Sequence, residues 1–321
     1  MPSWQEFQMM RRGDRLGLTR VTGTAALVLA GAGLAGCAGA GGAPLPALSR
    51  SPASAAASAG GLAGTSGNSP AAATPASQSS GQHAAQAPLS TPVPTHPAQP
   101  LAGQVIALDP GHNGANWSHP AIIDRLVNVV TEWKACDTAG AQTDAGYPEH
   151  AFTFDVAMRL ARLLRAEGAT VVLTRHNDHG VGPCVTQRAE IGNRAHADAA
   201  ISIHADGGPP GGTGFEVIAP GRIAGAPDAT VIGPSGRLAG DIRNAYHRIT
   251  GEPYSDYVGT RGLDVRTDLG GLNMSTVPKV FIECANMRNA ADAARVTSPR
   301  FRERVAVALA AGFTAFLNRH P

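Results

Sequence analysis

The sequence predicts a single α/β domain of three layers, in which helices flank both faces of a twisted, mostly parallel sheet. Two short apolar runs, residues 105–109 and 169–174, have the length and composition of buried strands. Residues 149–168 lie between them and place apolar side chains at helical spacing. Strand, helix and strand in succession imply two parallel strands joined by a right-handed crossover.

The first strand ends in Asp-Pro-Gly at residues 109–111, so the backbone turns abruptly before His112. Open α/β sheets place their binding crevices at the carboxyl ends of the strands. His112 is therefore a candidate site residue.

The next stretch, residues 113–148, is polar and too long for an ordinary connection, which indicates a functional loop with some local structure. Within it we expect one short amphipathic helix. Its apolar residues are Ile122, Ile123, Leu126, Val127 and Val130.

Glu149 opens the strongly predicted helix, where the helix dipole favours a carboxylate. The apolar face of this helix carries Phe152, Val156, Leu160, Leu163 and Leu164, and Gly168 is well placed to end it.

Further predicted elements complete the domain. They are a helix at 187–196, a strand at 199–203 that ends at His204, a strand at 215–218, a helix around 238–249, an apolar segment at 280–282 that leads into Glu283, and a closing helix that begins at Ser298-Pro299.

The N-terminal region has the features of a bacterial export signal. Four arginines precede a short, weakly apolar run at residues 21–36, which is too short and glycine-rich to be a good membrane-spanning helix. The run ends in Leu-Ala-Gly-Cys at 34–37, which resembles the lipobox of bacterial lipoproteins. That resemblance implies acylation of Cys37 and a lipid anchor in the membrane. Ordinary cleavage at a nearby small-residue site is the alternative.

Residues 38–102 predict a disordered linker. Between 38 and 100 the chain has no aromatic residue, and Arg50 is its only charged residue of the Lys, Arg, Asp and Glu types. Such a segment cannot bury enough apolar surface to offset its ordering entropy. We therefore divide the chain into a signal (1–37), a linker (38–102) and a folded domain (103–321).

The net charge of +2 gives no basic footprint of a nucleic-acid binder, and we expect no nucleic-acid partner. The four cysteines are too few for a disulfide scaffold and lack the C-x-x-C spacing of metal sites. We expect a monomer.

Three strand ends or helix starts carry His112, Glu149 and His204. Two imidazoles and one carboxylate with an open fourth position are the ligand set of hydrolytic zinc sites. Glu283, at the end of a fourth apolar segment, is available to carry a proton. The spacing alone is weak evidence, because a single histidine at a strand end is more often a hydrogen-bonded structural residue.

Sequence motifs along the folded part add to this evidence. They are IALDPGH (106–112), Glu149 at its helix start, VVLTR (171–175), Gln187-Arg188 before Ile191-Gly192-Asn193, ADAAISIHAD (197–206), RTDLGGLN (266–273), VPKVFIECANMRN (277–289) and Asp292. With these motifs, the chain from Val105 to about Leu317 resembles the zinc-dependent N-acetylmuramoyl-L-alanine amidases of the type 3 family, which cleave peptidoglycan.

The resemblance implies a role for each matching residue. His112, Glu149 and His204 correspond to the zinc ligands, and Glu283 corresponds to the catalytic glutamate. The sequence around Glu149 and the cysteine pair resemble the compact mycobacterial-type members, which lack a separate wall-binding module. The implied partners are peptidoglycan and muropeptides, and the implied location is the cell envelope, with the protein exported and anchored as a lipoprotein.

The resemblance also implies a disulfide between Cys136 and Cys184. Both cysteines lie in polar loops, where thiols of an exported protein tend to pair. Cys284 lies at the end of an apolar strand and is expected to be a free, buried thiol.

Other polar residues have less specific roles. Asp109 and Asn286 are candidates for orienting the metal ligands. Arg188 is expected to pair with a buried carboxylate rather than with substrate. Arg266 and Asp268 either contact substrate or pack a loop. Five other histidines of the domain (His119, His150, His176, His179 and His196) are expected to bind no metal.

Two alternative functions remain at this point. The first is another zinc-dependent amide hydrolase, such as a peptidase or a deacetylase. The second is a catalytically silent wall-binding or regulatory homologue, which would be expected to lack ligands or Glu283.

Overall fold

A computed structural model describes residues 99–224 and 229–319. The predicted signal, Cys37 and nearly all of the linker lie outside these residues. Leu101, assigned to the linker from sequence, has none of its surface exposed, and its N–H donates to the carbonyl of Glu167. The core therefore includes at least one residue before position 103.

The domain is built on a six-stranded sheet with the order β4-β1-β5-β8-β6-β7. The strands are β1 (Val105–Pro110), β4 (Thr170–Leu173), β5 (Ala199–Asp206), β6 (Glu216–Pro220), β7 (Leu263–Arg266) and β8 (Lys279–Asn286). All neighbouring strands are parallel except β6 and β8. The predicted α/β class with a mostly parallel sheet is confirmed.

The two faces of the sheet differ because side chains alternate along each strand. One face is apolar and joins the main core, with Ile106 and Leu108 from β1 and Ile201 and Ile203 from β5. On the other face, the intervening residues of β1 and β5 are small or polar. The site is formed on this second face, at the carboxyl ends of the strands.

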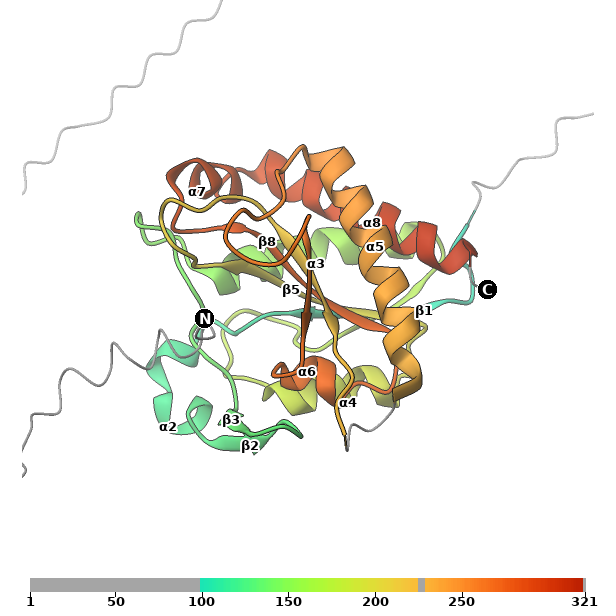
Figure 1. The fold of residues 1–321 in the computed structure, drawn as a ribbon, viewed down its shortest axis with the longest axis horizontal. Coiled ribbons are helices and arrows are strands. Elements are labelled where there is room, and N and C mark those ends of the chain that lie inside the picture. Colours follow the sequence, from blue (N-terminus) through green and yellow to red (C-terminus); the bar gives the residue numbers. More distant parts are fainter. Residues whose placement is uncertain (1–98, 225–228, 320–321) are drawn as a thin grey trace, which may run out of the picture. The chain divides into compact units, whose positions relative to one another are not determined.

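Helices cover both faces (Figure 1). The long helices α3 (Glu149–Ala166), α5 (Ile232–Thr250) and α8 (Pro299–Arg319) pack on the apolar face and supply most of the core. The shorter α4 (Val185–Arg194) and α6 (Gly270–Asn273) lie against the opposite face, and α7 (Ala290–Val296) follows β8. Two 3-10 turns occur at Asn116–Ser118 (η1) and Ala229–Val231 (η2).

The long polar stretch after β1 differs from the prediction of one amphipathic helix. The only α-helix there is the short α2 (Pro120–Ile123), and Leu126 and Val127 belong to β2 (Leu126–Asn128). This strand forms an antiparallel hairpin with β3 (Trp133–Ala135). The branched side chains at 126–127 suit a strand as well as a helix, and tertiary context decided between them.

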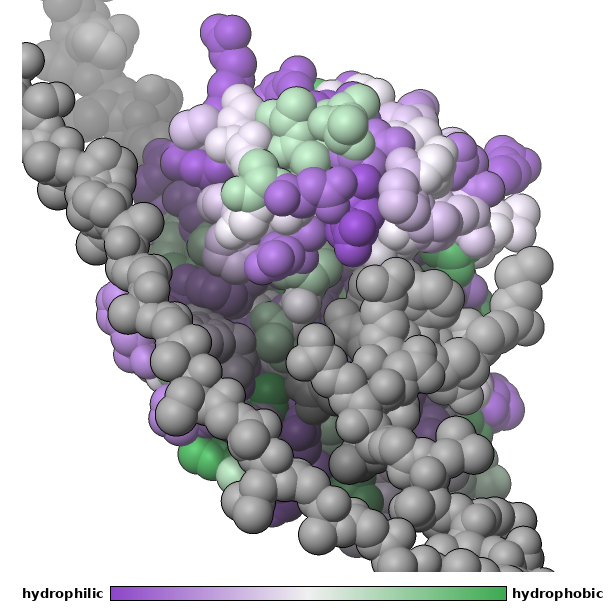
Figure 2. Space-filling model, turned by 90° about the vertical axis from the view of Figure 1, so that its left-hand side faces the viewer, coloured by the Kyte–Doolittle hydropathy of each residue, from purple (hydrophilic) through white to green (hydrophobic). Residues whose placement is uncertain are grey.

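The hairpin and α2 lie on the left-hand side of Figure 1, which Figure 2 shows face on. The coloured part of that face is mostly hydrophilic, with small apolar patches. Among the described residues, none of the helices combines the length and hydropathy needed to cross a membrane.

Candidate metal centre and active site

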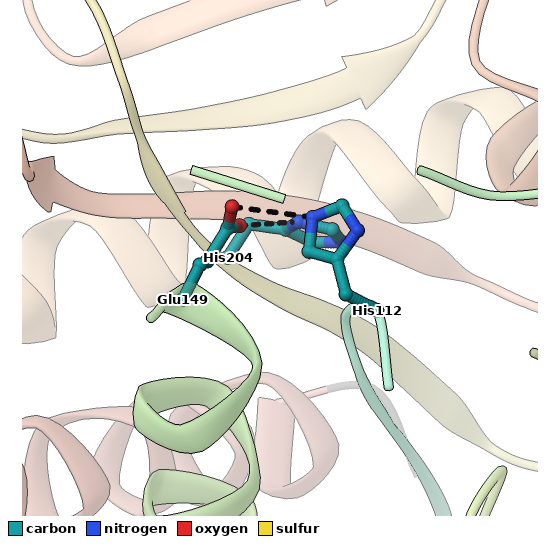
Figure 3. A group of neighbouring side chains, drawn as sticks. All are labelled: His112, Glu149 and His204. Carbon is teal, nitrogen blue, oxygen red and sulfur yellow. Dashed lines mark hydrogen bonds and ion pairs between the residues drawn. The ribbon is translucent and has the colours of Figure 1, made fainter. Parts of the chain in front are cut away.

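Three side chains from separate parts of the chain converge at the carboxyl edge of the sheet (Figure 3). His112 follows β1, Glu149 is the first residue of α3, and His204 lies in β5. One ligand atom from each side chain lies within 4.8 Å of the others. The predicted ligand set is therefore brought together, although its members are far apart in sequence.

The carboxylate of Glu149 lies between the two imidazoles. Its Oε2 is 3.2 Å from Nε2 of His112, and its Oε1 is 2.8 Å from Nδ1 of His204. Backbone N–H groups of Ala141 and Ala205 donate to the two oxygens, at 2.6 and 3.1 Å. These four contacts fix the orientation of the carboxylate at the helix start.

Two glycines make room for the convergent rings. A Cβ at Gly111 would lie 2.2 Å from the ring of His204, and a Cβ at Gly140 would lie 2.7 Å from the ring of His112. Gly140 also has a φ of +82°, which favours glycine. His112 itself has a φ of 60°, an uncommon value for a residue with a side chain and a frequent one at functional sites.

A second carboxylate holds His112 at its other ring nitrogen. Oδ1 of Asp137 lies 3.3 Å from Nδ1 of His112, and the carbonyl of Thr138 lies 3.0 Å from the same atom. The other oxygen of Asp137 accepts a hydrogen bond from Arg188 at 2.9 Å. Metal-binding histidines commonly use their second nitrogen in this way.

Arg188 is buried and links this contact to the core of the domain. Its guanidinium also donates to Asp109 at 2.9 Å and to the carbonyls of Pro110 and His112. The expected pairing of Arg188 with buried carboxylates is thus present in the structure.

The two residues proposed from sequence as orienting groups lie elsewhere. Asp109 reaches the site only through Arg188, and its other partners are Lys279, Ser202 and Thr174. Asn286 uses its side-chain N–H groups on the carbonyls of Pro209 and Gly212, so it braces a loop. Neither residue has a described hydrogen bond to a ligand side chain, because in each case the short side chain is already engaged by nearer groups.

The charges of the site reinforce one another. Burial alone would lower the pKa of His112, but the carboxylates of Glu149 and Asp137 outweigh it and raise the pKa to about 10. Burial would raise the pKa of Glu149, but the two imidazoles hold it well below the usual value. The pKa of His204 is lowered by burial. The carboxylate of Glu149 is therefore kept ionised, which is the form in which a carboxylate can bind a metal.

Glu283 lies beside the three candidate ligands on the same face of the sheet. It is the register partner of His204 in the parallel pair of β5 and β8. Its Oε2 is buried and has no hydrogen-bond partner among the described residues. Burial and the neighbouring Asp206 and Glu149 raise the pKa of Glu283 well above its usual value.

A disulfide joins Cys136 at the end of the hairpin to Cys184 at the N-terminus of α4. Cys136 immediately precedes Asp137, so this bond holds the segment that contacts His112. Cys284 is free and buried. The cysteine pairing that the resemblance implies is the one in the structure.

The remaining candidates have other partners. Arg266 donates to both oxygens of Asp268, and Lys134 of the hairpin binds the same carboxylate at 2.8 Å. His150 contacts Asp178 at 2.8 Å, and the side chains of His119, His176, His179 and His196 are exposed. None of these histidines belongs to the ligand cluster found among the described residues.

The contact of Asp137 with His112 was not foreseen from sequence. The two residues are 25 positions apart in a polar stretch without a periodic pattern. Glu216 was also missed, although a charged residue between the apolar Phe215 and Val217 is an unusual feature of a buried strand.

The fold and the site define a class of protein. A model of the N-acetylmuramoyl-L-alanine amidase family matches residues 106–315, which is most of the described domain and more than half of the chain. The protein belongs to this family.

Mycobacterial members of the family are similar to this chain. The N-acetylmuramoyl-L-alanine amidase Rv3717 of Mycobacterium tuberculosis is 40% identical over 236 residues, which cover 73% of this chain and 94% of that protein. The crystal structure of the amidase Ami1 from Mycobacterium smegmatis shares 41% identity, with a TM-score of 0.64, and covers 68% of this chain and 99% of its own. The apo form of Ami1 from Mycobacterium abscessus shares 42% identity, with a TM-score of 0.63, and covers 67% and 99%.

Proposed function

We propose that this protein hydrolyses the amide bond between the lactyl group of N-acetylmuramic acid and L-alanine of the stem peptide in peptidoglycan. Membership of the amidase family supports the reaction class. The observation that carries the proposal is the convergence of His112, Glu149 and His204 with Glu283 beside them. The protein would then act in remodelling, splitting or turnover of the cell wall.

We infer that the site holds one zinc ion, bound by His112, Glu149 and His204. Two imidazoles and a carboxylate are a ligand set of catalytic zinc sites with an open position. The fit is supported by the close approach of the three ligand atoms and by the two glycines that leave space around the rings. When bound, zinc lowers the pKa of a water molecule to about 7 and polarises a carbonyl group.

Glu283 is assigned as the proton carrier. Its carboxyl group would accept the proton of the attacking water and deliver it to the nitrogen of L-alanine, which is a poor leaving group without that proton. A raised pKa suits this double role, because the group must gain and then lose a proton near neutral pH. Burial of one carboxyl oxygen limits competing contact with solvent.

Product analysis tests the assignment of the bond. A muropeptide incubated with the zinc-loaded domain should yield free muramyl lactate and a stem peptide with a free L-alanine amine. Cleavage within the peptide would indicate a peptidase, and release of acetate would indicate a deacetylase. Absence of all three products from a folded, zinc-loaded protein would indicate a silent wall-binding homologue.

We also propose that the protein is exported and anchored in the membrane by a lipid on Cys37, with residues 38–98 as a linker between the anchor and the catalytic domain. The lipobox-like sequence and the scarcity of charged and aromatic residues in the linker support this arrangement. A chain that begins at residue 99 keeps Leu101 in the core. It should therefore melt at the same temperature as the chain that begins at residue 38.

A further inference from the structure

A row of side chains extends from the ligands across the polar face of the sheet. His204 in β5 is the register partner of Glu283 in β8, and Glu283 is in turn directly opposite Glu216 in β6. Residues directly opposite in an antiparallel pair have Cβ atoms about 4.5–5.5 Å apart. The adjacent pair in this ladder, Val217 of β6 and Ile282 of β8, belongs to the apolar core. The two glutamates therefore share the other face of the sheet.

Buried polar atoms without partners are concentrated around this pair. Six such side-chain atoms occur among the described residues, and four of them belong to Glu216, Glu283, Ser255 and Tyr257. Glu216 is only 2% exposed. Among the described ion pairs, none includes its carboxyl group. Native proteins rarely leave buried polar groups unsatisfied, and such groups are enriched at functional sites.

A proton on Glu216 removes the largest part of this cost. Two carboxylates side by side in a buried position cannot both be ionised easily, so one retains a proton. We assign the proton to Glu216 because its side chain is buried, whereas Glu283 is partly exposed. A protonated carboxyl group is a hydrogen-bond donor, and an ionised Glu283 is an acceptor.

The charged surroundings of Glu216 favour the neutral form. Burial, with the nearby Asp206 of β5 and Asp264 of β7, raises the pKa of Glu216 well above its usual value, although a contact with the hydroxyl of Ser255 and the charge of Arg266 oppose this. Arg266 is already engaged by Asp268. The hydroxyl of Tyr257 borders the same carboxyl groups and is itself neutral, because burial raises its pKa above the usual value.

We propose that Glu216 is a positioning residue for the reaction: a buried, neutral carboxylic acid that donates a hydrogen bond to Glu283 and holds it beside the ligands. This role rests on the proposed function of Glu283. It explains why an acidic residue is retained inside a strand that is otherwise apolar. It also predicts that activity is lost when Glu216 gives up its proton at high pH.

The test compares three variants by zinc content, kcat, KM for a muropeptide and the pH profile of kcat. Glu216→Gln replaces the acid by an amide, which donates a hydrogen bond at every pH, and should retain most of the wild-type kcat at neutral pH. Glu216→Ala removes the donor and should lower kcat by about 10²-fold, the usual effect of a misplaced catalytic group, with KM and zinc content little changed. Glu252→Gln is the matched control, since Glu252 is equally buried but pairs with Arg295 away from the site. It should leave kcat unchanged.

The pH profile separates positioning from packing. In the wild type, kcat should fall at high pH as Glu216 ionises, and this decline should be absent in Glu216→Gln. Wild-type kcat in a folded Glu216→Ala variant, or an unchanged alkaline decline in Glu216→Gln, would overturn the proposal. If Glu216→Ala does not fold, the glutamine variant and its profile decide alone. A failure of the role proposed for Glu283 gives a different result, because the Glu283→Ala variant would then retain wild-type turnover.

Discussion

Oδ1 of Asp137 lies 3.3 Å from Nδ1 of His112, at the ring nitrogen that does not face Glu149. The same carboxylate accepts a hydrogen bond from Arg188, which also binds Asp109 in the core. The orientation of the imidazole is therefore fixed through a chain of buried charges that begins in β1. Burial disfavours the charged form of both Arg188 and Asp137, but their ion pair outweighs it. The pKa of Arg188 is raised, and the pKa of Asp137 is lowered to about 2.

Asp137→Asn should weaken zinc binding by about 10-fold to 100-fold, the usual effect of losing a group that orients a metal ligand. The amide keeps the volume of the side chain but loses the charge that favours the N–H of His112. Competition with a chelator measures the affinity. Asp144→Asn is the control, because Asp144 is an exposed aspartate paired with Arg288. Equal affinities for the two variants would contradict the role of Asp137.

Arg188→Met should lower the free energy of unfolding by about 3–5 kcal/mol at neutral pH, because it leaves the buried charge of Asp137 uncompensated and leaves Asp109 with Lys279 as its remaining cation. Arg188→Lys should recover little, since an ammonium cannot replace the planar fork that donates to both carboxylates. Denaturant unfolding monitored by circular dichroism measures both values.

The sign of the pH dependence follows from Asp109. Burial would raise its pKa, but Lys279 and Arg188 lower it well below the model-peptide value of 3.8. The ionised carboxylate of Asp109, paired with Lys279 and Arg188, therefore stabilises the fold above about pH 3.8. This contribution is lost progressively as the pH falls below that value. The difference between wild type and Arg188→Met should shrink in the same range. A difference that is constant from pH 7 to pH 3 would show that lost packing, not charge, is the cause.

The strand ends that carry the site were predictable from sequence, and the contacts between them were not. His112, Glu149 and His204 each follow or begin an element with a clear apolar pattern, so their convergence at one edge follows from the α/β class. The antiparallel pairing of β6 with β8 could not be predicted in this way, because the sequence pattern does not show which strands are neighbours in the sheet. Without that order, nothing in the sequence places Glu216 opposite Glu283.

The local sequence pattern also gave a wrong prediction where it fits a helix and a strand equally well. Leu126 and Val127 were predicted to be helical and lie in the hairpin, where the exposed Leu126 contributes little to the core. Asp137 owes its role to the hairpin and the adjacent disulfide, which are features of tertiary structure. Its function is therefore visible only once residues 126–137 are placed against β1 and α4.

Removing the disulfide should destabilise the domain by about 4 kcal/mol, given the separation of 48 residues between Cys136 and Cys184 and the chain-entropy model. Because Cys136 precedes Asp137, the double alanine variant should also bind zinc more weakly. Thermal unfolding and chelator competition, each with and without reductant, measure the two effects. Reductant should lower the melting temperature and the zinc affinity of the wild type, and it should leave both values unchanged in the double variant. An effect of reductant on the double variant would point to another cause.

Cys37→Ala should move the protein from the membrane fraction to the soluble fraction of the producing cells, because the acylated residue is then missing. The catalytic domain does not include this position, so the specific activity of the purified protein should be unchanged. Immunoblots of fractionated cells and mass spectrometry of the mature N-terminus provide the measurements. An unmodified N-terminus at another residue in the wild type would show ordinary signal cleavage instead.

Metal binding and proton transfer are assigned to different residues, so alanine variants should separate them. Replacement of His112, Glu149 or His204 should reduce zinc content and abolish hydrolysis together, because each would supply one of the three proposed ligand atoms. Glu283→Ala should keep near-stoichiometric zinc and bind muropeptide, while turnover falls by about 10²–10⁴-fold, the usual contribution of a positioned general acid or base. Its stability should change little or increase, since the variant removes a buried oxygen that has no described partner. Zinc content and muropeptide cleavage are measured on all four variants in parallel. Loss of zinc from Glu283→Ala would make Glu283 a ligand, and wild-type turnover in that variant would remove it from the reaction.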